Sequence, residues 1–147
     1  FEMIQRKPIS IHAKSFAVGV RIEHPQEMIN DAQYGEIEHG ILPAAAYKVT
    51  HKLENGRGVY SFCMCPGGYV VNASSEEERI AVNGMSYHKR DGENANSAII
   101  VTVTPEDFEG DDALAGVRFH IKQEKATYRF SVLKIFVQIE SQKHWEV

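Results

Sequence analysis

The sequence predicts an α+β domain built mainly of antiparallel β-sheet with two or three helices. In Lys14–Glu23 apolar residues alternate with polar ones, as in a strand that buries one face, and several other short segments are also typical of strands. A loop of sequence ENGRG (54–58) joins two such segments and is typical of a hairpin, in which neighbouring strands run antiparallel. Segments near residues 25–34 and 114–130 have the spacing and ends of helices.

Length and composition are those of one globular domain. The 147 residues suffice to bury a core, and 43% are hydrophobic and 24% charged. A net charge of −4 and dispersed basic residues argue against a nucleic-acid partner. The longest apolar run, Ala98–Val103, is far shorter than the roughly 20 residues of a membrane helix, so we expect no membrane partner. With only two cysteines, no disulfide framework is expected, and the expected location is cytoplasmic.

The N-terminal half predicts a strand followed by a helix. Phe1–Gln5 is expected to finish a helix that Pro8 stops, and the absence of an initial Met favours a piece of a longer protein. Lys14–Glu23 is the expected strand, and Pro25 starts the helix that Gly35 ends. The expected buried side of the strand consists of Phe16, Val18, Val20 and Ile22, and that of the helix of Met28, Ile29 and Ala32.

The C-terminal half predicts further strands and one long helix. The expected strands are Ala46–Leu53, Gly58–Cys65, Tyr69–Ala73, Arg79–Val82 and the buried run Ala98–Val103. Gly84–Ser97 is expected to be a long polar loop with a functional role. Thr104–Asp107 has the hydroxyl, proline and acids of a helix start, and Leu114–Phe130 is the expected helix.

The stretch Tyr60–Val71, YSFCMCPGGYVV, holds both cysteines. On a regular strand Cys63 and Cys65 would share one face. A zinc site needs four ligands, and the histidines are scattered, so we expect no metal. A disulfide would need a kink, because residues two apart on an extended strand lie roughly 6.5–7 Å apart. Burial as small apolar side chains is the simplest interpretation, and presentation of a thiol to a ligand is the other that stays open.

Three short segments combine glycines with amides, hydroxyls and charges: Pro66–Gly68, Asn83–Ser86 and Lys89–Ser97. Paired glycines allow another group to approach the main chain closely, although they also form ordinary tight turns. The polar side chains could bind a polar ligand, or could belong to solvated loops stabilised by Asx turns.

Long strings of this sequence resemble one bacterial family, the FAD-dependent dehydrogenases also called NAD(P)/FAD-dependent oxidoreductases. The resemblance rests on AVGVRIEHPQEMINDAQYG, on GRGVYSFCMCPGGYVVNASSEEERIAVNGMSYHKRDGENANSAIIVTVTPEDF and on LAGVRFH. It implies that residues 1–130 form the substrate-side, FAD-capping domain of a two-domain flavoprotein. The segment 131–147 is unmatched and is expected to pack on the same domain. No GxGxxG fingerprint is present, so the dinucleotide-binding motif is expected elsewhere in the parent chain.

The resemblance also implies roles for particular residues. Candidate catalytic residues are Cys63 and Cys65. Candidate cofactor-binding residues are Pro66, Gly67, Gly68, Asn83, Gly84 and Ser86, and candidate substrate-binding residues are Arg90, Asp91, Glu93, Asn94 and Asn96.

The implied function is that of an FAD-dependent oxidoreductase in the intact parent. The expected partners are a Rossmann-type FAD-binding domain of the same parent chain and a small-molecule substrate. We expect the isolated chain to be inactive and to bind no FAD by itself. The alternative is a non-catalytic α+β domain that binds a metabolite or a partner.

Overall fold

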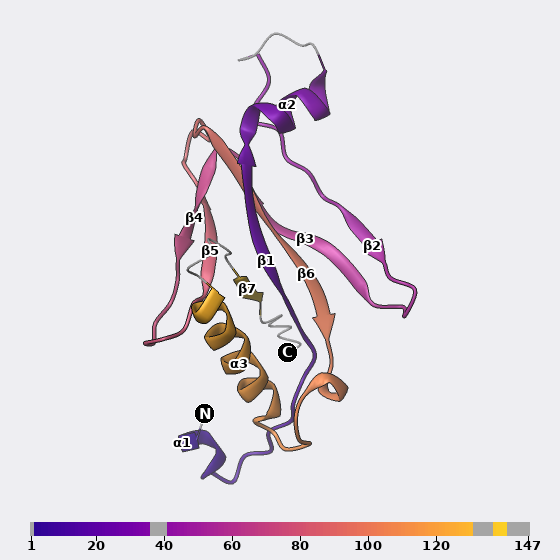
Figure 1. Cartoon of the computed structure of the whole chain (residues 1–147), viewed down its shortest axis with the longest axis vertical. Coiled ribbons are helices and arrows are strands. Elements are labelled where there is room, and N and C mark those ends of the chain that lie inside the picture. Colours follow the sequence, from indigo (N-terminus) through magenta and orange to yellow (C-terminus); the bar gives the residue numbers. More distant parts are fainter. Residues whose placement is uncertain (1, 36–40, 131–136, 141–147) are drawn as a thin grey trace.

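The computed structural model of this chain describes residues 2–35, 41–130 and 137–140. The described residues form antiparallel sheets and α-helices, which confirms the predicted α+β class (Figure 1). In chain order the elements are α1 (Glu2–Gln5), β1 (Phe16–Pro25), α2 (Gln26–Tyr34), β2 (Thr50–Lys52), β3 (Gly58–Cys65), β4 (Gly68–Asn72), β5 (Val82–Ser86), β6 (Asn94–Val103), the 3₁₀ turn η1 (Pro105–Asp107), α3 (Ala115–Phe130) and β7 (Val137–Glu140).

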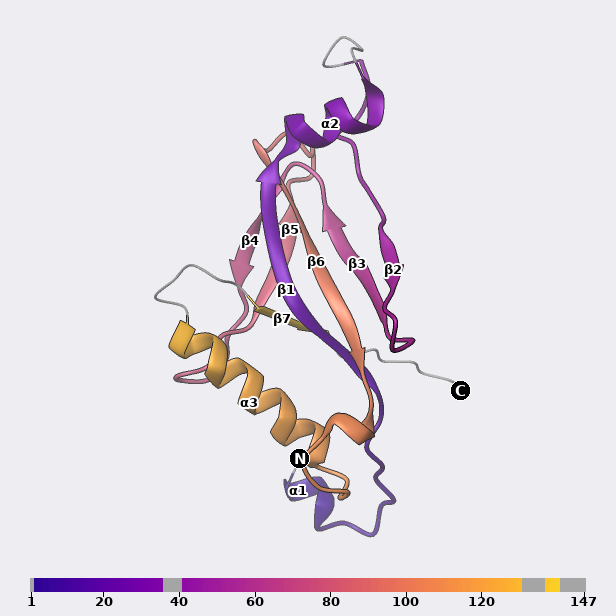
Figure 2. The same cartoon turned by 45° about the vertical axis from the view of Figure 1, so that its right-hand side comes forward.

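The larger sheet has five strands in the order β2-β3-β6-β1-β7, and each neighbouring pair is antiparallel. Its centre is the pair β1 and β6, which runs in register from Phe16 opposite Val103 to Pro25 opposite Asn94. Figures 1 and 2 show these two strands side by side along the length of the sheet. β1 ends and β6 begins beside α2, so residues from distant parts of the sequence meet there.

The smaller sheet is the hairpin of β4 and β5, which packs on one face of the larger sheet (Figure 1). Gly84 of β5 lies directly over the centre of this contact. A Cβ atom at Gly84 would stand 2.1 Å from Nη1 of Arg21 and 2.2 Å from Oδ1 of Asn96. Only glycine therefore allows β5 to lie this close to β1 and β6.

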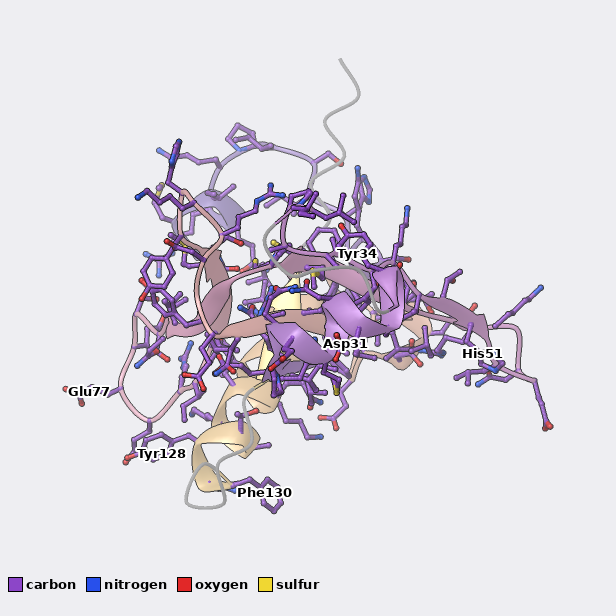
Figure 3. All side chains as sticks on the ribbon, turned by 90° about the horizontal axis from the view of Figure 1, so that it is seen from above. Asp31, Tyr34, His51, Glu77, Tyr128 and Phe130 are labelled. Carbon is purple, nitrogen blue, oxygen red and sulfur yellow. The ribbon has the colours of Figure 1, made fainter. Side chains whose placement is uncertain are left out.

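The core consists of three small clusters along the larger sheet. The buried members are Ala17, Ala98 and Ile100 in the middle, Ile29, Ala45 and Ala95 where α2 meets the sheet, and Val103, Phe108 and Ala115 where α3 begins. The ring of Phe16 stacks on that of Phe108 with centroids 5.2 Å apart, and both rings pack against Phe119 of α3, which holds this helix against the sheet. Viewed from above, Figure 3 shows Asp31 and Tyr34 of α2 near the middle, with His51 and Glu77 at opposite sides.

Phe16 and Val18 pack against the core as predicted, but the buried side of the second half of β1 differs from the prediction. Val20 and Ile22 are 38% and 41% exposed, whereas Arg21 is only 3% exposed. The reason is that the β4–β5 hairpin covers the side to which Arg21 belongs, a long-range contact that alternation within β1 cannot show. On α2, Ile29 is buried as predicted, but Met28 and Ala32 are exposed.

The predicted long loop Gly84–Ser97 is wrong at both ends. Its first residues belong to β5, which covers Val82–Ser86 rather than Arg79–Val82, and its last residues begin β6 at Asn94. Strand propensity disfavours asparagine, but tertiary hydrogen bonds to β1 offset this cost, as described below. At the predicted helix start, Thr104 and Asp107 form a capping box, although it caps only the short turn η1.

Candidate functional site

The glycine-rich segments meet at the α2 end of the two sheets. The carbonyl oxygen of Gly67 accepts hydrogen bonds from the backbone N–H groups of Tyr87 at 3.3 Å and Gly92 at 3.2 Å. The predicted segments Pro66–Gly68, Asn83–Ser86 and Lys89–Ser97 are thus brought together, as Figure 2 shows at the ends of β4, β5 and β6 nearest α2.

Gly67 and Gly68 are packed closely by the chain's own backbone. Gly67 has φ of +52°, and a Cβ there would stand 2.0 Å from the carbonyl oxygen of Arg90. A Cβ at Gly68 would stand 1.8 Å from the carbonyl oxygen of Met85. These two glycines, with Pro66, are buried. The groups that approach these glycines closely are therefore backbone atoms of the loop 87–92 and of β5, and not atoms of a ligand.

Gln26 connects α2 to this glycine corner and was not predicted. Its side chain is 6% exposed, and its Oε1 accepts a hydrogen bond from the N–H of Gly67 at 2.7 Å. Its Nε2 donates to the carbonyl oxygen of Ala45 at 2.9 Å, and its backbone N–H donates to Glu93 at 2.9 Å. One glutamine thus holds three segments together, because it offers both a donor and an acceptor.

A buried polar pair lies beneath the corner. Nη1 of Arg21 donates to Oδ1 of Asn96 at 2.6 Å and to the carbonyl oxygen of Cys63 at 3.1 Å. Asn96 is 0% exposed, and within the described residues its Nδ2 has no hydrogen-bond partner. Arg21 was missed by the sequence analysis; the only signal was a charged residue on the polar side of a predicted strand.

Glu23 joins the two sheets at the same end. Its Oε1 accepts from Nδ2 of Asn94, and its Oε2 accepts from the N–H of Val70, both at 2.9 Å. The amide of Asn94, predicted to bind substrate, is therefore used at least in part to fix the hairpin on the sheet. Asn94 and Asn96 are tolerated in β6 because Glu23 and Arg21 supply these partners.

The two cysteines do not share a face, which corrects the prediction. The ladder between β3 and β6 shifts register between Phe62 and Cys65, and Cys63 has φ of +46°. This bulge leaves Cys63 exposed and Cys65 buried. Burial raises the pKa of the Cys65 thiol, and the neighbouring Cys63 raises it further, while the positive charge of Arg21 acts in the opposite direction.

Next to this cluster, His24 packs its ring on Tyr47, with centroids 5.5 Å apart. Burial lowers the pKa of His24 despite the nearby Glu23, and burial raises the pKa of Tyr47. Within the described residues, Nε2 of His24 is buried and has no hydrogen-bond partner. In the sequence, His24 was not distinguishable from the other scattered histidines.

An exposed face lies on the outside of the β4–β5 hairpin. We call it the outer hairpin face and define it by Tyr69, Asn83, Met85 and Tyr87. Tyr69 is directly opposite Met85 in the ladder, and its ring lies 5.2 Å from that of Tyr87. Tyr69, Met85 and Tyr87 are 41%, 48% and 53% exposed. Of the other predicted site residues, Cys63, Arg90, Asp91 and Glu93 are also exposed.

Other features of the described residues lie away from this cluster. A cavity of about 690 Å³ lies between α3 and the connection of β4 to β5, and Arg79, His120 and Glu124 contribute to its wall. Within residues 2–35, 41–130 and 137–140, no group of three or more His, Cys, Asp or Glu side chains could hold a metal ion. In the same ranges, every helix is too short or too polar to cross a membrane.

Together, the fold and the cluster define an α+β domain whose glycine-rich corner and outer hairpin face come from three separate segments. Residues 15–145 match the family described as "FAD-dependent protein, C-terminal domain-like", and the chain belongs to this family. A Clostridium beijerinckii protein that is named only "Uncharacterized protein" is 56% identical over 131 residues. The alignment covers 88% of this chain and 25% of that protein, so the chain spans about a quarter of its relative's length.

These findings make the chain a flavoprotein-related domain. The outer hairpin face offers aromatic rings and an amide to a planar heteroaromatic group, whereas the chain lacks the GxGxxG motif that binds a pyrophosphate.

Proposed function

We propose that this chain is the substrate-side domain of an FAD-dependent oxidoreductase and that its outer hairpin face docks on a dinucleotide-binding domain of the same parent protein. The single observation that supports this most strongly is the family match, which covers residues 15–145. When bound, the flavin would supply the acceptance and donation of a hydride or of electrons. The protein residues would position the ring and the substrate and exclude water.

The length of the relative supports a second domain as the occupant of the outer hairpin face. Three-quarters of the Clostridium protein lie outside the aligned region, since the alignment covers 25% of it. Contacts between domains of one chain typically bury about 600–1,500 Å² and include apolar side chains. Tyr69, Met85 and Tyr87 are neighbouring and exposed, and they could contribute such a contact.

The exposure of the predicted site residues suggests a division of roles. Exposed residues such as Asn83 and Arg90 are available to a cofactor or substrate. Gly67, Gly68, Gly84 and Asn96 are buried by contacts within the chain. We infer that the buried set acts by holding the backbone in place, and that the exposed set provides the direct contacts.

The test uses the full-length protein that contains this chain, purified without denaturants, and measures bound flavin by absorbance and by release on denaturation. The wild-type protein is expected to retain FAD. Tyr87→Glu is expected to weaken FAD retention and slow flavin reduction at least ~10-fold, equivalent to about 1.4 kcal/mol. Met28→Glu is the matched control, because Met28 is 52% exposed but lies on α2.

The two parts of the proposal fail separately. A full-length protein without flavin, which also takes up none when FAD is added, would overturn the oxidoreductase function. Normal flavin content with equal behaviour of Tyr87→Glu and Met28→Glu would overturn the docking surface alone. That second result would favour the alternative of a domain that binds a metabolite or partner without contacting the flavin.

A further inference from the structure

We propose that Cys63 and Cys65 form a redox-active dithiol, in which the exposed Cys63 attacks a low-molecular-weight disulfide and the buried Cys65 then closes an internal disulfide. This site goes beyond the proposed flavin function and does not depend on it. The reaction requires only the two thiols and the disulfide oxidant.

A disulfide between residues two apart is disfavoured on a regular strand by the separation of their Cα atoms, and the bulge in β3 changes that geometry. Residues two apart on an extended strand lie at the limit of disulfide geometry, because their Cα atoms are roughly 6.5–7 Å apart. Here the ladder is interrupted between Phe62 and Cys65, and the φ of +46° at Cys63 takes the chain out of the extended conformation. The Cys65 thiol donates a hydrogen bond to the carbonyl oxygen of Cys63 at 3.3 Å, so the buried thiol lies against the backbone of the neighbouring cysteine.

Exposure assigns a different role to each thiol. A thiol must be accessible to attack a disulfide in solution, and Cys63 is exposed whereas Cys65 is 7% exposed. Cys65 is shielded from a bulky disulfide, but it needs only to reach the sulfur of its neighbour. Cys63 is therefore the attacking residue, and Cys65 is the resolving residue.

The surroundings of Cys65 include groups that favour its thiolate against the effect of burial. The positive charge of Arg21 is close enough to lower the pKa of this thiol, which burial raises. Asn96 lies directly opposite Cys65 in the ladder and is 0% exposed. Its Nδ2 has no hydrogen-bond partner among the described residues, and buried amides seldom lack one. An anionic sulfur at Cys65 is an acceptor that this position could use.

The chemistry balances in two exchanges. The Cys63 thiolate attacks one sulfur of the disulfide RSSR, so that a mixed disulfide forms and one thiolate leaves and becomes RSH. The Cys65 thiolate then attacks Sγ of Cys63, and the second RSH leaves. Two electrons pass from the protein dithiol to RSSR, and the products are one internal disulfide and two RSH.

The experiment incubates this chain in glutathione buffers of increasing oxidised fraction, followed by an acid quench, alkylation with N-ethylmaleimide and intact-protein mass measurement. The expected product is a monomer that has lost two hydrogens and accepts no alkylating group. Before oxidation, alkylation of Cys65 is expected to be at least ~10-fold slower than that of Cys63, because Cys65 is buried and the reagent reaches it poorly.

Two variants separate the steps. In Cys65→Ala the glutathione adduct on Cys63 should accumulate, since no resolving thiol is present. In Cys63→Ser the remaining Cys65 should stay free of glutathione until the protein is unfolded. Circular dichroism of each variant identifies any loss of structure, and phenylarsine oxide, which binds close thiol pairs, provides a second measurement on the unsubstituted chain.

Three results would overturn the dithiol: a glutathione adduct that persists in the wild-type chain, a disulfide between two chains, or an internal disulfide that forms only in urea. None of these measurements involves flavin. Their outcome is therefore distinguishable from success or failure of the oxidoreductase proposal.

Discussion

The guanidinium of Arg21 donates a hydrogen bond to Oδ1 of Asn96 at 2.6 Å and thereby links the two central strands of the larger sheet beneath the glycine corner. Neither side chain is more than 3% exposed. A charged group at this depth is costly unless its hydrogen bonds are made, so removal of its partner should have a large effect.

Asn96→Ala is therefore expected to lower the free energy of unfolding by about 1.5–3 kcal/mol, the usual range for losing a buried hydrogen bond to a charged group. Urea unfolding followed by circular dichroism measures this change. Gln33→Ala, an exposed substitution on α2, is the control and should stay within about 0.5 kcal/mol of wild type. Equal effects of the two substitutions would show that the pair contributes little.

Gly67→Ala should be among the most damaging substitutions in the chain. The new Cβ would lie 2.0 Å from the Arg90 carbonyl oxygen at a residue with φ of +52°. We expect a loss of at least ~3 kcal/mol, since both the clash and the backbone strain oppose folding. Gly58→Ala is the matched control, because a Cβ there would meet nothing within 4 Å. A normal denaturation midpoint for Gly67→Ala would contradict the packing described at this corner.

The two cysteines should differ in their effect on stability. Cys65→Ser places a hydroxyl in a buried position and is expected to cost about 1–3 kcal/mol. Cys63→Ser should change the free energy of unfolding by less than about 0.5 kcal/mol, since this side chain is exposed. Thermal unfolding under reducing conditions tests the pair, and the opposite order would place Cys63 in the core.

Asp107 should make stability depend on pH at the acidic end. Its carboxylate accepts hydrogen bonds from Nη1 and Nη2 of Arg57 at 2.7 and 2.8 Å and from the N–H of Thr104 at 2.8 Å. The hydrogen bonds from Arg57, followed by that from Thr104, lower the pKa of Asp107 from 3.8 to about 2. Because the folded-state pKa is below the unfolded one, this stabilisation is complete above about pH 4 and is lost as pH falls toward 2.

Asp107→Asn is thus expected to lower stability by about 1 kcal/mol near neutral pH, a value typical of a helix-cap or ion-pair loss. The difference from wild type should shrink between pH 4 and pH 2, the window set by these two pKa values. Denaturant titrations across this range measure it. A difference that is constant at all pH values would mean that the negative charge of Asp107 is unimportant.

Much of the framework could be predicted because it depends on local patterns. The alternation in residues 14–23, the ENGRG hairpin and the spacing of residues 114–130 correctly indicated β1, the β2–β3 hairpin and α3. The segments Pro66–Gly68, Asn83–Ser86 and Lys89–Ser97 were also singled out from the sequence for their glycines and polar side chains, but that they meet became clear only from the hydrogen bonds of Gly67. Arg21, Gln26 and Glu23 escaped notice, because a polar residue on a strand or helix looks the same in sequence whether it faces water or a buried partner.

The sequence by itself determined the α+β class, the order of most elements and the small residues without which the corner could not form. Only the tertiary structure decided which side of β1 is buried and which cysteine is exposed to solvent. It also decided which glycines pack directly against other backbone segments of the chain. The physical reason is that strand and helix periodicities arise from neighbours along the chain. The burial of Arg21 and Asn96 depends instead on where the β4–β5 hairpin packs, a contact that brings together residues far apart in the sequence, such as Gly84 and Arg21.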